Sequence, residues 1–490
     1  MTDTSASTDG LRKDLARLVQ QLIDERPERR RERPVTPLVL AHLGDGARSL
    51  PVLQDTVPYY DLPNLHLALE RLPVRPGWSV EILGVAGEDE GWHELSLPSL
   101  LMNDVWEAAP ERFATADVGP GQTLACRVSC LMLITAPEGP LALLLSRHDS
   151  GEGHVLSLEI VSPVEGAAAE LLAWLHATIA EVDVFRGKVL TVEASPMRGT
   201  SRIAFVERPD VRADALVLPD GVLDRIERHI IGASRHRQAL IDSGRHLGRG
   251  LLLWGPPGTG KTLTLRYLTA MLTGSTVIIL TGPSLGMAGS FGALARRLEP
   301  AVVILEDVDL VAQERMYGPF GGSSPVLFEL MNEMSGPSGD ADVAFVLTTN
   351  RPEALEPALA ARPGRVDLAL EIPLPDAAAR HRLLELYARG MDMALDDPDA
   401  VVARTQGVTA SFIKELLRKA RLEAAEAGRV TVMQADVDAA LDELLHETQA
   451  LTRVMLGAGG DRAPDGRAAS RAWLEQFPDA DGFDDDDVED

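Results

Sequence analysis

The sequence is short of cysteine and of long apolar runs, and each shortage excludes a class of protein. Only two of the 490 residues are cysteines, which is too few for a disulfide-stapled scaffold. No histidine stands beside them, so a four-ligand zinc site is not expected either. Cys126 and Cys130 lie four positions apart in the apolar stretch "LACRVSCLML". Every second residue of a strand points to the same face, so this spacing predicts two buried thiols on one face of a strand.

Apolar stretches are also short. None approaches the roughly 18 residues that a membrane-spanning helix needs. The first ten residues, "MTDTSASTDG", have neither the basic start nor the apolar core of a signal peptide. We therefore expect a cytoplasmic protein with no membrane partner.

Positive charge is in deficit, because 74 acidic residues oppose 47 basic ones and the net charge is -27. A general nucleic-acid binder would carry a basic footprint, so nucleic acid is not an expected partner, although a local basic groove stays possible. Eight of the acids fall in "DADGFDDDDVED" at 479–490. This stretch predicts a disordered acidic tail that either aids solubility or docks elsewhere.

A length of 490 residues predicts two or three domains. Strand patterns and a helical pattern alternate in the first half, without a catalytic constellation. In the second half, near-continuous apolar strands alternate with helices, which favours a parallel sheet covered on both faces. The expected parts are a helical arm and charged linker (1–34), a mixed α/β N-terminal domain of unknown role (35–207), a linker (208–220), an α/β domain (221–375), a C-terminal helical lid (376–447) and the acidic tail (448–490).

The lid is predicted by a change to helical patterns only. Asp376 and Thr409 stand where they can cap two helices, which Gly390 and Gly428 would end.

The stretch "GLLLWGPPGTGKT" carries the strongest motif, because Gly255 to Thr262 fit G-x-x-x-x-G-K-[ST] between an apolar strand and a helix. Backbone N–H groups of such a loop wrap phosphates, helped by the positive end of the helix. Lys261 would reach the β- and γ-phosphates, and the Thr262 hydroxyl would hold Mg²⁺. The expected nucleotide-binding residues are Gly255, Pro256, Pro257, Gly258, Thr259, Gly260, Lys261 and Thr262.

A second apolar strand, "AVVILEDVD", ends in Glu306 and Asp307, with a further acid at Asp309. Hydrolysis needs one carboxylate near Mg²⁺ and a group that orients or deprotonates water. Glutamate precedes aspartate here, whereas the reverse order is usual, so each carboxylate is displaced by about one C–C bond, roughly 1.5 Å. Slow and normal turnover are both compatible with this order.

Three more polar residues complete the candidate site. Asn350 ends the apolar strand in "DVAFVLTTN", where its amide could orient water beside the γ-phosphate. Arg362 and Arg365 flank a Pro-Gly turn, and an arginine supplied to a phosphoryl-transfer site is worth about 10³ to 10⁵ in rate. Two surface arginines in an ordinary turn are the alternative interpretation.

Taken in order, "GPPGTGKT", "VILEDVD", "LFELMNEMSG", "TTN" and "RPGRVD" resemble the AAA clade of the AAA+ superfamily, over about residues 218–446. The resemblance implies an α/β P-loop ATPase domain with a helical lid, bound ATP and Mg²⁺, and a homo-oligomeric ring, commonly a hexamer. It places Glu306 on the metal-side carboxylate, Asp307 on the catalytic one and Asn350 on sensor 1. Arg362 and Arg365 would reach the site of the neighbouring subunit. The Glu-Asp order also resembles the branch that translocates the mitochondrial Rieske protein, which favours an active ATPase.

The sequence departs from this family at several points. The pore loop of the unfoldases has an aromatic residue, whereas the corresponding residues here are Met287, Ala288 and Gly289, and the lid shows no sensor-2 arginine. The turn before Arg362 is one residue longer than usual. "HELSL" and "HETQA" both miss the last histidine of H-E-x-x-H, so a fused zinc protease of that kind is excluded. Ser284 formally fits a nucleophile elbow, but the family pattern already accounts for its strand.

These features predict an ATP-hydrolysing ring motor that remodels or disassembles a protein target presented by the N-terminal domain. A nucleotide-gated assembly scaffold with little turnover is the alternative.

Overall fold

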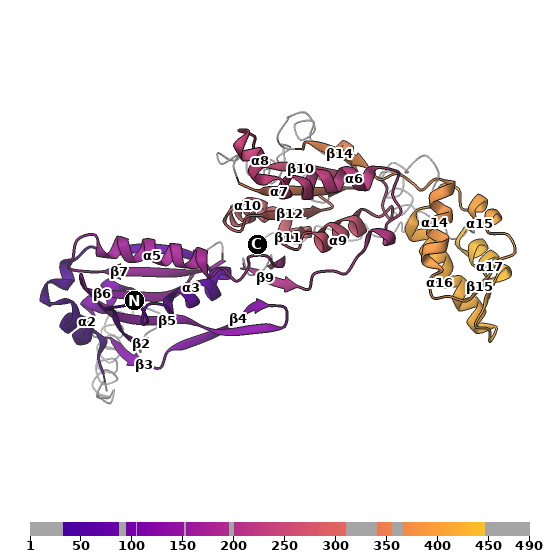
Figure 1. The fold of residues 1–490 in the computed structure, drawn as a ribbon. Coiled ribbons are helices and arrows are strands. Elements are labelled where there is room, and N and C mark those ends of the chain that lie inside the picture. The colour runs from indigo at the N-terminus through magenta and orange to yellow at the C-terminus, as the bar shows by residue number, and fades with distance from the viewer. Residues whose placement is uncertain are drawn as a thin grey trace, which may run out of the picture. The chain divides into compact units, whose positions relative to one another are not determined.

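The computed structural model describes residues 33–87, 95–103, 105–150, 153–195, 200–309, 341–354 and 366–445. Several sequence expectations lie outside these ranges, namely the N-terminal arm, the motif "LFELMNEMSG", Arg362, Arg365 and the acidic tail. The chain divides into two compact units (Figure 1). The first comprises residues 1–116 and 123–182, and the second comprises residues 117–122 and 183–490. Among the described residues, no helix is long and apolar enough to cross a membrane.

The first unit is built on an antiparallel sheet in the order β1-β7-β6-β5-β2-β3, with β4 paired to β5. Its strands are β1 (Leu53–Pro58), β2 (Ser79–Gly87), β3 (Trp106–Ala109), β4 (Arg112–Gly119), β5 (Gln122–Ala136), β6 (Gly139–Ser150) and β7 (Gly153–Val161). Its helices are α2 (Val35–Leu43), α3 (Leu62–Leu69), α4 (Leu97–Met102) and α5 (Ala167–Glu181).

Alternation along β5 supplies two hydrophobic cores, one on each face of this sheet. Cys130 and Met132 pack with α3 and α5, whereas Leu131 and Leu133 pack with α2 and α4. Successive side chains of a strand point to opposite faces, so an apolar run without polar alternation is what a doubly covered sheet requires. Cys126 and Cys130 lie in the first of these cores as free, buried thiols, as the alternation predicted.

The second unit contains the parallel sheet that the apolar runs predicted, in the order β14-β10-β13-β12-β11-β8-β9. Its strands are β8 (Val189–Ser195), β9 (Thr200–Val206), β10 (Arg249–Trp254), β11 (Thr276–Thr281), β12 (Ala301–Glu306), β13 (Val343–Thr349) and β14 (Leu368–Glu371). All pair in parallel except β9, which is antiparallel to β8.

One boundary differs from the expectation. Residues 183–207 were assigned to the N-terminal domain, yet β8 and β9 belong to the sheet of the second unit. The reason is that β8 pairs in parallel with β11 and extends its edge, with Leu190 opposite Ile278. This pairing joins segments about 90 residues apart, so local sequence patterns do not predict it.

Helices cover both faces of this sheet. On one face, α6 (Val222–Glu227) and α9 (Lys261–Met271) share a core with Val302 and Ile304 of β12. The alternate residues Val303 and Leu305 are buried away from that core, and α10 (Ala288–Arg297) packs against β11 and β12. Three short helices, η4 (Arg228–Gly232), α7 (Ala233–Arg235) and α8 (Arg237–Asp242), connect α6 to β10.

The helical lid follows Asp376. Its helices are α14 (Ala377–Tyr387), α15 (Pro398–Arg404), α16 (Ala410–Glu426) and α17 (Gln434–Leu445), around a core of its own. The side chains of Asp376 and Thr409 cap α14 and α16 as predicted, by accepting from the N–H groups of Ala379 and Phe412. A two-stranded ladder of β15 (Met393–Ala394) and β16 (Val432–Met433) adds a small pairing that the helical patterns did not indicate.

Candidate functional site

The predicted phosphate loop joins β10 to α9. It runs from Gly255 to Gly260, and α9 begins at Lys261. Gly255 has a φ of 146°, and a side chain there would put its Cβ 2.2 Å from the carbonyl oxygen of Ile372. Only glycine fits that backbone and that space. The loop is therefore held close to the chain that follows β14, with the amino end of α9 directed into it.

Lys261 is almost fully buried within this loop. Its Nζ donates to the carbonyl oxygens of Gly255 at 2.7 Å and Pro256 at 2.8 Å. Burial lowers the pKa of Lys261, while the charges of Asp307 and Asp309 act in the opposite direction. The ammonium group thus lies at the phosphate loop and within electrostatic reach of the acids that follow β12.

Thr262 and Glu306 come together from two different elements. Glu306 ends β12, and its side chain forms a hydrogen bond with that of Thr262 at the start of α9. Burial raises the pKa of Glu306, the hydrogen bond with Thr262 lowers it, and the charge of Asp307 raises it further. A hydroxyl and a carboxylate oxygen in contact are hard oxygen ligands of the kind that Mg²⁺ prefers, so these two residues fit a magnesium site.

Asp307 is held in an unusual backbone conformation. Its φ is 52°, the single non-glycine residue with positive φ in the described chain. Its N–H donates to Thr348 Oγ1 at 3.0 Å, and its Oδ1 accepts from Asn350 Nδ2 at 3.2 Å. Aspartate is several-fold enriched in this left-handed region, whereas longer side chains gain no local hydrogen bond to offset the strain. The Glu-Asp order therefore puts the better-suited acid at the strained position.

Asp309 is a site residue for which the sequence indicated no role. It is buried, and its Oδ1 accepts from Thr349 Oγ1 at 2.9 Å and from the N–H of Asn350 at 3.2 Å. These bonds tie the chain after β12 to the carboxyl end of β13, which lies between β12 and β10 in the sheet. An acid two residues beyond Asp307 was the available signal, but its partners are 40 residues away.

Residues of the helical lid contact the phosphate loop. Ser411, at the start of α16, donates to the carbonyl oxygen of Gly258 from its N–H at 3.1 Å and from its Oγ at 3.2 Å. Beside Thr259 lies a cavity of about 500 Å³. It is lined by Val217, Leu218, Pro219, Asp220, Ile372, Pro373, Leu374, Pro375, Asp376, Ala378, Ala379, Arg382, Leu383 and Ala410. Its position next to the phosphate loop suits the base of a nucleotide.

Two further residues singled out in the sequence have structural surroundings. Ser284 Oγ accepts from the N–H of Thr281 at 2.9 Å and donates to its carbonyl oxygen at 2.9 Å, deep in the protein. It caps a helical turn and is not presented as a nucleophile. Met287 ends that turn, η5 (Gly282–Met287), and is half-buried.

The comparisons agree with this geometry. Residues 251–374 match the family described as "ATPase family associated with various cellular activities (AAA)". The ATP-dependent zinc metalloprotease FtsH of Acidimicrobium ferrooxidans is 28% identical over 260 residues, 51% of this chain and 39% of its own length. An FtsH of Cutibacterium acnes is 32% identical over 225 residues, 43% of this chain and 31% of that protein.

A third relative, the proteasome-activating nucleotidase of Methanocaldococcus jannaschii, is 28% identical over 306 residues, 59% of this chain and 68% of that protein. The chain thus spans about two fifths of the first FtsH relative. The family match at 251–374 lies in the second unit of this chain. The phosphate loop, the acids after β12 and the polar end of β13 all fall within residues 251–374. Residues 251–374, within the second unit, therefore match an ATPase domain of the AAA family.

Proposed function

We propose that this chain binds ATP with Mg²⁺, hydrolyses it, and uses the cycle to remodel a protein target. One observation carries the proposal. Lys261, Thr262, Glu306, Asp307 and Asn350 come from three elements and meet at one edge of a parallel sheet. That edge is where ligands bind in open α/β sheets.

Each residue has a role that follows from its contacts. Lys261 and the N–H groups of the loop would hold the β- and γ-phosphates. Thr262 and Glu306 would hold Mg²⁺, which offsets the negative charge that develops on the phosphates. Asp307 would accept a proton from the attacking water or orient that water. Asn350 fixes the direction of the Asp307 carboxylate through the bond from its amide.

The Glu-Asp order supports hydrolysis rather than loss of it. The first acid contacts Thr262, and the second is held by Asn350 and Thr348. These contacts support a metal-side role for Glu306 and a water-side role for Asp307 in spite of their reversed order.

Assembly into a ring, commonly a hexamer in the AAA clade, is part of the proposal and rests on the family resemblance. Arg362 and Arg365 would then complete the site of a neighbouring subunit. The first unit would present the protein target or an adaptor. Protein targets fit the acidic net charge of -27 better than nucleic acid does.

The test is steady-state ATP hydrolysis with Mg²⁺, measured over a range of protein concentrations for the native chain, Asp307→Ala and Asp210→Ala. Asp210 is an exposed acid of the same unit and makes a matched control. We expect turnover per chain to rise with concentration, to collapse in Asp307→Ala and to be retained in Asp210→Ala. A native chain that binds ATP and assembles without turnover would contradict the proposal.

That last outcome would favour the alternative, a nucleotide-gated scaffold. One observation favours the scaffold: residue 287 is a methionine, where the pore loop of the unfoldases has an aromatic residue. If the chain threads polypeptide, Met287→Ala should slow processing of a protein target while leaving ATP hydrolysis intact.

A further inference from the structure

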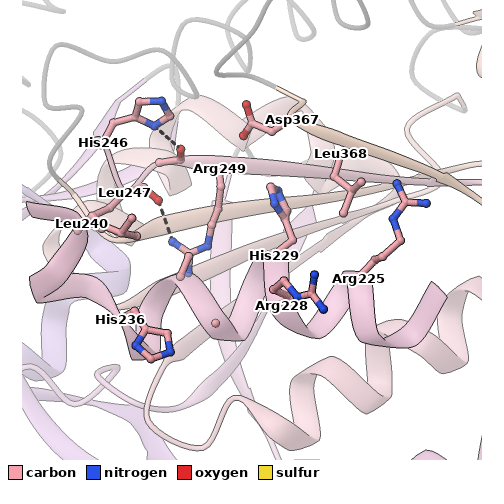
Figure 2. Close-up of a pocket in the computed structure, with 13 residues that line it drawn as sticks. Arg225, Arg228, His229, His236, Leu240, His246, Leu247, Arg249, Asp367 and Leu368 are labelled. Atoms are coloured by element: carbon pink, nitrogen blue, oxygen red, sulfur yellow. Dashed lines mark hydrogen bonds between the residues drawn. The ribbon is translucent and has the colours of Figure 1, made fainter. Parts of the chain in front are cut away.

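A second cavity, of about 600 Å³, lies at the opposite edge of the parallel sheet (Figure 2). It sits beside Arg249 and Leu368, where β10 and β14 begin, whereas the phosphate loop follows the far end of β10. The length of β10 separates the two sites by about 17 Å. The lining residues are Arg225, Arg228, His229, Gly232, Ala233, His236, Leu240, His246, Leu247, Gly248, Arg249, Asp367 and Leu368. We call this the basic pocket.

Three basic side chains of the pocket already have hydrogen-bond partners within the protein. Arg249 donates one hydrogen bond to Asp342 and one to Ser234. It donates three more to the carbonyl oxygens of Ile230 and Leu247. His229 and His246 each form a hydrogen bond with a backbone carbonyl, at 3.1 Å and 3.0 Å. These groups shape the pocket and are not its free charges.

Arg225 and Arg228 are different, because both guanidinium groups are exposed and form no hydrogen bond or ion pair within the described chain. They lie three residues apart, and small residues at Gly232 and Ala233 leave the hollow beside them. The carboxylate of Asp367 is the one acid of the lining, and it accepts from the N–H of Gly250 at 3.1 Å. Two guanidinium groups without an intramolecular partner at the rim of the pocket can bind carboxylates or phosphates.

The basic pocket also has an apolar wall. Leu240, Leu247 and Leu368 line it from the helix α8, the loop before β10 and the strand β14 (Figure 2). Leu247 is buried, and the other two are half-buried. A ligand that complements this pocket would combine negative charge with an apolar group.

The surrounding segment is basic in an acidic protein. Residues 225–249 contain six arginines and two acids, a local excess of four positive charges, whereas the whole chain carries -27. Eight of the 74 acidic residues lie in residues 479–490, where "GFDDDD" puts Phe483 directly before four aspartates. The same short stretch thus holds one aromatic side chain and a run of carboxylates.

We propose that the basic pocket binds the acidic segment 479–490 of this chain, with Phe483 against the leucine wall and the aspartates at 484–487 paired with Arg225 and Arg228. The 33 residues at 446–478 join the last described helix to this segment. Fully extended, they reach about 110 Å. A compact unit of this size has a radius of gyration near 18 Å. The connection is therefore long enough to reach the pocket.

The test is zero-length carbodiimide crosslinking in the full chain, which joins a carboxylate to an amine in direct contact. Arg228→Lys keeps the charge and introduces an amine at the pocket, while Arg212→Lys introduces one at an exposed arginine elsewhere. We expect Arg228→Lys to yield crosslinks to residues 484–487, read by mass spectrometry, at least tenfold more often than Arg212→Lys. Adding Arg225→Glu to Arg228→Lys should reduce them by about tenfold.

A free peptide of residues 479–490 should compete with the crosslink. The same peptide with Phe483→Ala should compete about tenfold less well, because it cannot bury an aromatic ring against the leucine wall. Equal crosslinking at both lysines would overturn the proposal, since it would reflect only unspecific attraction. Loss of the crosslink with inorganic polyphosphate but not with the peptide would assign the pocket to phosphate anions instead.

Discussion

Asn350 donates from its side-chain amide to Asp307 Oδ1 at 3.2 Å, across the carboxyl ends of β13 and β12. The bond aims a carboxylate that could otherwise rotate, on a residue whose own backbone has a φ of 52°. Under the proposed function, these two residues, 43 positions apart in the sequence, would together orient the attacking water.

Asn350→Ala should therefore lower turnover of ATP by about 100-fold, since a small misplacement of a catalytic group costs this much. Nucleotide affinity should change less than about threefold, because Asn350 is not one of the loop residues that would hold the phosphates. Steady-state hydrolysis and titration with a fluorescent nucleotide measure the two quantities. The exposed Asn103→Ala in the first unit is the matched control. Equal losses of affinity and turnover would show that Asn350 acts in binding instead.

Glu306→Asp tests the metal-side position. Shortening the side chain by about 1.5 Å withdraws its carboxylate from Thr262. We expect the Mg²⁺ concentration for half-maximal ATP hydrolysis to rise by about tenfold. Asp307→Glu should instead reduce the maximal rate with little change in that concentration. The same Mg²⁺ dependence in both variants would contradict the division of roles between the two acids.

The buried pair Arg249–Asp342 should stabilise the ATPase unit. Arg249 Nη1 lies 2.8 Å from Asp342 Oδ1, with side chains 5% and 1% exposed. Asp342→Ala leaves a buried guanidinium without its carboxylate, which costs about 3–5 kcal/mol. Hydrogen exchange of peptides from β10 and β13 in a urea series should show the loss. The double variant Arg249→Met with Asp342→Leu should recover part of it, and no recovery would show that the loss does not come from the stranded charge.

The two thiols should be unreactive in the folded protein. Burial raises the pKa of Cys126 to about 11 and that of Cys130 to about 12. A raised thiol pKa keeps the protonated form at pH 8, and the thiolate is the reactive form. Alkylation at pH 8 should therefore be slower than for a free thiol by about 100-fold at Cys126 and about 1,000-fold at Cys130, and it should rise about tenfold per pH unit. Two thiols should react at the ordinary rate in denaturant. Rapid alkylation in the native protein would mean that the core of the first unit opens readily.

Local patterns in the sequence determined much of this protein. The phosphate loop between β10 and α9, the apolar strands of the parallel sheet and the helix caps at Asp376 and Thr409 depend on neighbouring residues, so spacing was enough to place them. Glu306, Asp307 and Asn350 could be selected as well, because each ends a recognisable apolar strand.

Only the tertiary structure decided how these parts meet. The pairing of β8 with β11, the role of Asp309 and the basic pocket all join residues distant along the chain. Their cause is packing and hydrogen bonding between elements, which no local period records. The φ of Asp307 belongs here too, since the contacts of Thr348 and Asn350 hold it there. The order of the two acids could be read from the sequence, but the positive φ that suits an aspartate at position 307 was visible only in the fold.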